Sequence, residues 1–148
     1  MLIRRAALQD VYRLRGCYLD EKLFLYGEDM EICEAAHRAG YRTVMARHAV
    51  VYHGAASSSG GQFNAMAYYY QNRNRIFMAS GNLAMPWHAF FHLLNGAVCS
   101  VRILKNLASR RPQAAMAIFR GMVDGYRGIG GKWKYHDREA QKTQCRIP

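Results

Sequence analysis

The feature that most restricts the fold of this chain is a long apolar segment at residues 83–104. A helix that crosses a membrane needs about 20 mostly apolar residues, and this segment is long enough. It also contains His88, His92, Asn95 and Arg102. A charged group at bilayer depth costs roughly 3 kcal/mol unless it is paired. We therefore do not expect the segment to span a membrane.

Two other environments suit the same segment. Trp87, Phe90, Phe91 and Leu94 have the spacing of a helix that lies in the plane of a membrane surface. Basic residues follow at its end, where they would meet anionic headgroups. A helix packed inside a larger protein would show the same apolar spacing. The sequence leaves a membrane-surface helix and a buried packing helix as alternatives.

Proline and glycine residues set the expected limits of the helices. Pro86 and Pro112 suit the first turns of helices over residues 86–108 and 112–127. Gly40 suits the position after a helix end. Apolar periodicity predicts three further helices, over residues 4–11, 28–39 and 62–79.

Short strands are expected between the second and third of these helices. Residues 42–46 and 49–52 are rich in Val and Tyr, which favour extended structure. The predicted fold class is therefore α/β, with a partial sheet of two or three short strands and helices, followed by a mostly helical carboxyl-terminal region.

The chain has 148 residues, which is the size of one domain. Three regions are distinguished by composition. Residues 1–80 contain the candidate catalytic and ligand-binding residues. Residues 81–131 are expected to be helical, and residues 132–148 form a basic tail expected to be disordered.

Charge is concentrated in the second half. Residues 81–148 hold 11 basic and 3 acidic residues, against 10 and 7 in residues 1–80. Such a bias favours an anionic partner, such as a membrane surface, a phosphorylated substrate or nucleic acid. Nucleic acid is the weakest of these, because no binding motif accompanies the charge. The four scattered cysteines predict reduced thiols and a cytoplasmic location.

Glu28 and Asp29 directly follow an aromatic loop, residues 24–27, that ends in glycine. One carboxylate could be a general base that removes a proton from a hydroxyl, while its neighbour holds that hydroxyl by a hydrogen bond. Acidic residues are also common at helix starts, where they stabilise the helix dipole. From the pair alone, helix capping is favoured over catalysis.

Two further groups could bind a ligand. His53 follows the strand expected at residues 49–52 and could bind a divalent cation through its neutral imidazole, or simply a backbone group. Arg73 and Arg75 could bind phosphate, because a guanidinium fork matches phosphate oxygens. The tyrosines at positions 68–70 beside them are interpreted first as packing residues.

Taken in order, these motifs resemble the carboxyl-terminal half of a family two glycosyltransferase of the rhamnosyltransferase-like branch, which has a GT-A fold. The likeness includes Tyr26-Gly27-Glu28-Asp29 within residues 18–33, then residues 38–42 and 49–54, then Asn72-Arg73-Asn74-Arg75. It extends more weakly to residues 120–125. The ordered set carries the resemblance, because the acid pair alone is common.

This resemblance implies an inverting transfer of a sugar from a nucleotide-diphosphate donor to a glycan or lipid-linked acceptor hydroxyl, in cell-surface polysaccharide synthesis. Asp29 would be the base and Glu28 would orient the acceptor. His53 would be a ligand to Mg or Mn on the diphosphate. The acceptor wall would include Phe24, Tyr26 and Gly27.

The resemblance covers only the acceptor side of such an enzyme. The chain has no Asp-x-Asp metal motif and no Gly-rich phosphate loop. We therefore expect it to be incomplete alone and to need a complementary chain that supplies the donor-binding half and completes the metal site. The alternative is a non-catalytic module derived from such an enzyme, peripheral on the cytoplasmic face of a membrane or bound to a partner.

Overall fold

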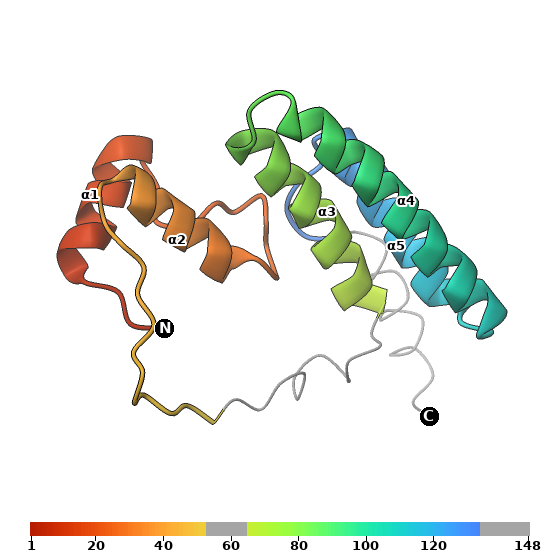
Figure 1. Ribbon diagram of the computed structural model, residues 1–148, viewed down its shortest axis with the longest axis horizontal. Helices are drawn as coiled ribbons and strands as arrows, with labels where there is room; N and C mark the ends of the chain where they lie inside the picture. Colours follow the sequence, from red (N-terminus) through yellow and green to blue (C-terminus); the bar gives the residue numbers. More distant parts are fainter. Residues whose placement is uncertain (53–64, 134–148) are drawn as a thin grey trace, which may run out of the picture.

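The computed structural model describes residues 1–52 and 65–133 (Figure 1). The described residues form five α-helices and no β-strand. The helices are α1 (Arg5–Arg15), α2 (Glu28–Arg38), α3 (Ala65–Asn82), α4 (Trp87–Ala108) and α5 (Pro112–Tyr126). Helices α1 and α2 pack against each other, and α3, α4 and α5 form a second group in which α3 and α4 both contact α5.

The expected α/β fold with a GT-A-type sheet is wrong for the described part of the chain. Residues 42–46 and 49–52 were expected to be strands, but they belong to an open segment with a turn at 47–48. All side chains from Arg42 to Tyr52 are exposed, and that of Val51 is 80% exposed. Val and Tyr favour strands because they fit a half-buried pleated surface, and no strand in the described ranges provides one.

Helix α1 is longer than the periodicity predicted. It continues to Arg15, and Gly16 ends it in the left-handed conformation at φ 77°. The Gly16 amide donates to the carbonyl of Tyr12 over 2.7 Å, which closes the last turn. Glycine adopts this conformation without a steric penalty, so the chain reverses here and not at Tyr12.

Helix α2 begins at Glu28, directly after Gly27 at φ 91°. Three acidic residues lie in its first turn, where they stabilise the positive end of the helix dipole. The prediction of a helix start at residue 28 is confirmed. Helices α4 and α5 also begin within one residue of the positions that Pro86 and Pro112 indicated.

The close contact between α3 and α5 depends on small residues. Gly121 lies against the backbone of Tyr69, and a Cβ added to Gly121 would be 2.4 Å from the Tyr69 carbonyl oxygen. Gly125 lies one turn further on, where a Cβ would be 3.0 Å from the Ile76 side chain and 3.1 Å from the Arg73 carbonyl oxygen. Buried alanines complete this face of α5. The glycines therefore let the two helix backbones approach more closely than side chains would allow.

Helix α4 has its polar side facing the other helices. Its two buried residues are Asn95 and Cys99, and the Cys99 thiol donates to Asn72 of α3 over 3.3 Å. Arg102 also donates to Asn72, over 3.2 Å. The large apolar residues of α4 are mostly exposed, namely Trp87, Phe90, Leu93, Leu94, Val98, Val101, Leu104 and Leu107. This is the reverse of an ordinary surface helix, which buries its apolar side.

The apolarity of α4 does not make it a membrane span. Within the described ranges, no helix combines the length and the hydrophobicity that crossing a bilayer requires.

Trp133 belongs to the folded structure, although it lies within the tail expected at residues 132–148. It is buried and stacks on Tyr69, with ring centroids 4.2 Å apart and planes inclined by 5°. Its amide donates to the hydroxyl of Tyr70 over 2.7 Å. The rest of that tail, residues 134–148, lies outside the described residues.

Candidate functional site

The loop that precedes Glu28 and Asp29 is held by a side chain of α3. The amide nitrogen of Asn74 donates to the carbonyl oxygens of Leu23, Leu25 and Tyr26 over 3.0, 2.8 and 2.7 Å. Asn74 is itself almost fully buried. An amide has two N–H bonds, so three carbonyls share two donors and converge on one point. The loop is therefore fixed to α3 through its backbone.

Arg73 holds the same loop from the neighbouring position. Its Nη2 donates to the carbonyls of Lys22 and Leu23 over 2.8 and 2.7 Å, and its Nη1 donates to Gly131 over 2.6 Å. Its Nε donates to Asn74 over 3.0 Å. The guanidinium thus ties together three parts of the chain, namely α3, the loop before α2 and the segment after α5.

The burial of the Arg73 charge is compensated by carbonyl dipoles and aromatic rings. The guanidinium carbon lies 4.8 Å from the ring centroid of Tyr70 and 5.3 Å from that of Tyr69. Buried charges need such partners because desolvation is costly. We predicted that Arg73 and Arg75 bind a phosphate. The structure places Arg73 fully inside the protein with its donors on backbone carbonyls, whereas Arg75 is exposed.

The held loop has an unusual backbone. Phe24 and Tyr26 are left-handed at φ 59° and 65°, and Gly27 follows at φ 91°. A left-handed residue other than glycine costs on the order of 1 kcal/mol, so it persists only where surrounding contacts impose it. Arg73 and Asn74 supply those contacts. The Phe24 side chain remains half exposed and lies 5.5 Å from the Tyr70 ring.

Glu28 and Asp29 both point into solvent from the first turn of α2. Asp29 Oδ1 accepts a hydrogen bond of 2.9 Å from the Met30 amide. That bond pairs one of the amides that a helix start leaves without an intrahelical partner, although the N-cap residue itself, Gly27, makes no side-chain cap hydrogen bond. The side chain of Asp29 nevertheless stays accessible to another molecule.

Asp29 lines an open cavity of about 620 Å³ on the side of α2. Cys33 and His37 follow it at intervals of four residues, and Glu34, Arg42 and Thr43 complete the polar lining. Cys33, His37 and Arg42 are not among the site residues that the sequence predicts. The spacing of four along α2 indicates a shared helix face and could have grouped the first two with Asp29.

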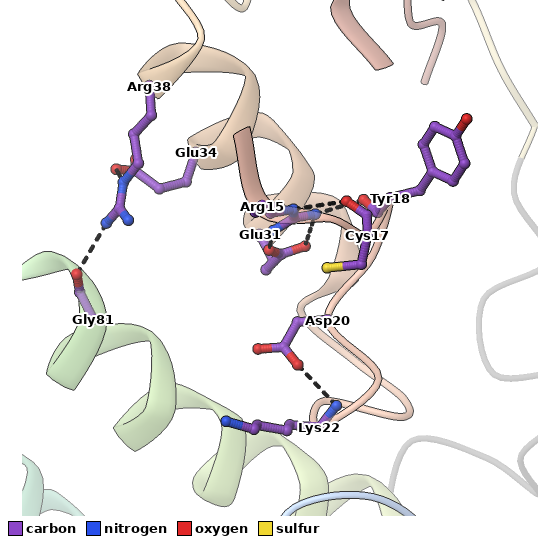
Figure 2. Close-up of polar contacts among 9 residues, drawn as sticks. All are labelled: Arg15, Cys17, Tyr18, Asp20, Lys22, Glu31, Glu34, Arg38 and Gly81. Atoms are coloured by element: carbon purple, nitrogen blue, oxygen red, sulfur yellow. Dashed lines mark hydrogen bonds and ion pairs between the residues drawn. The ribbon is translucent and has the colours of Figure 1, made fainter. Parts of the chain in front are cut away.

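Two arginines fix the position of α2 (Figure 2). Arg15, at the end of α1, forms an ion pair with Glu31 and donates to the carbonyls of Cys17 and Tyr18. The hydrogen bond to Glu31 raises the pKa of Arg15 above its ordinary value. At the other end of α2, Arg38 donates to the Gly81 carbonyl of α3 over 2.9 Å. Both ends of α2 are thus attached to other elements.

The described residues do not assemble a site for Mg or Mn. No three His, Cys, Asp or Glu side chains in residues 1–52 and 65–133 come together as metal ligands. His53, which we predicted as a ligand, lies outside the described residues.

No protein family model, curated protein or solved structure matches this chain. Function must therefore be argued from the residues and their geometry.

Proposed function

We propose that this chain is the acceptor-side part of an inverting glycosyltransferase that transfers a sugar from a nucleotide-diphosphate donor to an acceptor hydroxyl, in cell-surface polysaccharide synthesis. The proposal begins from the ordered motifs that resemble such enzymes. Those motifs include the loop 24–27, the acid pair that follows it and the Asn-Arg-Asn-Arg segment of α3.

The observation that supports the proposal best is the attachment of this loop to Asn74 and Arg73. Left-handed residues other than glycine are concentrated at binding and catalytic sites, where the surrounding structure imposes them. A binding surface also needs rigid support if it is to orient a reactant. Arg73 and Asn74 are therefore proposed as positioning residues, and the exposed Phe24 as part of the acceptor wall.

In the proposed reaction Asp29 accepts the proton of the acceptor hydroxyl while that oxygen attacks the anomeric carbon. The bond between this carbon and the nucleotide diphosphate breaks in the same displacement. Glu28 accepts a hydrogen bond from the acceptor and orients it. The donor-binding half comes from a complementary chain. We assign no step to a metal, because the described residues do not form a site for Mg or Mn.

The test is reconstitution with the donor-binding half of a related enzyme in trans, followed by measurement of sugar transfer. Removal of a general base slows such a step by about 100- to 10,000-fold, which is the loss expected for Asp29→Asn. Glu21→Gln removes another exposed carboxylate and is expected to leave transfer unchanged. Equal transfer by Asp29→Asn and the parent chain would show that Asp29 is not the base. A wild-type mixture that transfers no sugar would contradict the proposal as a whole.

A second candidate function, attachment to an anionic membrane surface, is favoured by α4. We propose that its exposed apolar face lies in the headgroup region of the bilayer. Trp87 and Phe90 are 66% and 57% exposed at its start, and exposed basic residues follow at its end, at Lys105, Arg110 and Arg111. Helices that lie in a membrane interface combine an apolar face with aromatic residues and cations in this way.

Sedimentation with phosphatidylserine-containing vesicles tests this attachment. Binding is expected to weaken as salt is added, because the Debye length falls to about 10 Å at 0.1 M. Leu93→Gln combined with Val101→Gln is expected to reduce binding, since both side chains are exposed on α4. Gln71→Ala, on α3, serves as the matched control. Failure of the wild-type chain to sediment at low salt would rule out the membrane as the partner of α4.

A further inference from the structure

We propose that His88 and His92 form a binding site for a divalent transition-metal ion of the copper and nickel type, separate from the carboxylate site on α2. The two residues lie one turn apart on α4, so both imidazoles extend from the same face of the helix. Their Nε2 atoms are 3.0 Å apart, and both side chains are partly exposed.

The nitrogen-to-nitrogen distance favours one type of ion over others. Two facing imidazoles can share one proton, or each can give a lone pair to the same metal ion. With metal–nitrogen bonds of about 2.05 Å, nitrogens 3.0 Å apart subtend an angle of about 94° at the metal. This is close to the right angle of square-planar or octahedral coordination, which Cu²⁺ and Ni²⁺ adopt, and smaller than the tetrahedral angle that Zn²⁺ prefers.

Tyr126 supports the pair from α5. Its hydroxyl lies 3.1 Å from His92 Nδ1, on the side of the ring away from His88. When His92 Nε2 binds a metal, Nδ1 carries the proton and donates it to the tyrosine oxygen. Such a partner fixes the tautomer and the orientation of a ligating imidazole. The ring of His92 is further confined by edge contact with Phe91 at 5.1 Å between centroids.

The site supplies two protein ligands and leaves the other coordination positions to water. Imidazole nitrogen suits Cu²⁺ and Ni²⁺, whereas Mg²⁺ and Ca²⁺ prefer oxygen ligands. The site therefore differs in kind from the Mg or Mn site that the glycosyltransferase resemblance implied.

The full chain can be titrated with Ni²⁺ by calorimetry, with circular dichroism to confirm that each variant is folded. We expect one Ni²⁺ per chain, no competition from Mg²⁺, and binding at least tenfold weaker in His88→Gln and His92→Gln. Tyr126→Phe is expected to weaken binding by about tenfold, as loss of an outer-shell partner does. His48→Gln removes an exposed histidine from the turn at 47–48 and is expected to change nothing.

Two further readouts are independent of calorimetry. Ni²⁺ is expected to raise the urea midpoint of the wild-type chain and not that of His92→Gln, because an ion that binds only the folded state stabilises it. The electron paramagnetic resonance spectrum of the Cu²⁺ complex is expected to show two nitrogen ligands. Equal Ni²⁺ binding by the wild-type chain and both histidine variants, or a Cu²⁺ spectrum with fewer than two nitrogens, would overturn the proposal.

Discussion

Gly121 of α5 lies directly against Tyr69 of α3, so that a Cβ on Gly121 would be 2.4 Å from the Tyr69 carbonyl oxygen. The neighbouring atom is backbone in the middle of a helix, which cannot move aside without separating the two helices. The contact between α3 and α5 therefore depends on the absence of one side chain.

Gly121→Ala is expected to lower the free energy of unfolding by about 2 kcal/mol, because overpacking forces the backbone to shift. Urea denaturation measures the change. Gly96→Ala is the matched control, since a Cβ on Gly96 of α4 meets nothing within 4 Å. That variant is expected to gain up to about 1 kcal/mol, the usual preference for alanine over glycine in a helix. Equal effects of the two substitutions would show that the helices are not packed this closely.

Asn74→Ala is expected to release the loop before α2 and to cost about 2 kcal/mol of stability, because buried carbonyls lose their donor. Hydrogen exchange at residues 22–27 is expected to become faster than in the parent chain. Gln71→Ala changes an exposed residue of the same helix and should leave exchange in the loop unaltered. Unchanged protection of the loop in Asn74→Ala would mean that other contacts hold it.

Tyr69 is expected to be a late-titrating tyrosine. Burial, together with the hydrogen bond of 2.7 Å that its hydroxyl donates to Asp124, raises the pKa of Tyr69 to about 12. Because this value is above the ordinary pKa of about 10, the unfolded chain loses the proton first. Folding stability linked to this group is therefore complete below pH 10 and falls as the pH rises toward 12.

The absorbance of phenolate measures this titration directly. The difference between the wild-type chain and Tyr69→Phe is expected to have its midpoint near pH 12. A difference curve centred near pH 10 would show that the Tyr69 hydroxyl is not held in this environment.

Arg15→Lys is expected to destabilise the chain by about 1 to 2 kcal/mol, because an ammonium group cannot reproduce the planar fork that contacts Glu31 and two carbonyls. Arg13→Lys is the control. Arg13 also pairs with a carboxylate, that of Asp10, but its side chain is 77% exposed, and such surface pairs contribute little. Thermal unfolding of the two variants makes the comparison, and full stability of Arg15→Lys would show that the contacts of Arg15 do not fix the position of α2.

Several helix boundaries could be predicted because they depend on local chemistry, although the end of α1 at Gly16 was missed. Pro112 occupies the first position of α5 because its fixed φ suits a helix start, and that preference needs no distant partner. Gly27 precedes α2 for a similar local reason. The strand prediction failed because a strand exists only with a neighbour. Val50 and Val51 have the right side chains but lie 76% and 80% exposed in the described structure.

The candidate site was only partly predictable for the same reason. Glu28 and Asp29 could be identified from their position after Gly27. The support that Arg73 gives to Lys22 and Leu23 joins residues about fifty positions apart, so no local pattern indicates it. Trp133 was likewise assigned to the tail, because its burial depends on Tyr69, far away along the chain.

The orientation of α4 affects which substitutions the chain can tolerate. In most helices a polar replacement of a large aliphatic residue harms folding, and the pattern of accepted replacements marks the interior. On α4, replacements at the 76% exposed Leu93 are expected to leave the packing with α3 and α5 intact, whereas replacements at the buried Asn95 are expected to disturb it. A mutational scan that selects for folding alone would therefore accept polar residues at Leu93, and one that selects for activity at a surface would reject them. Positions at which the two scans disagree would identify the exposed residues of α4 that the activity requires.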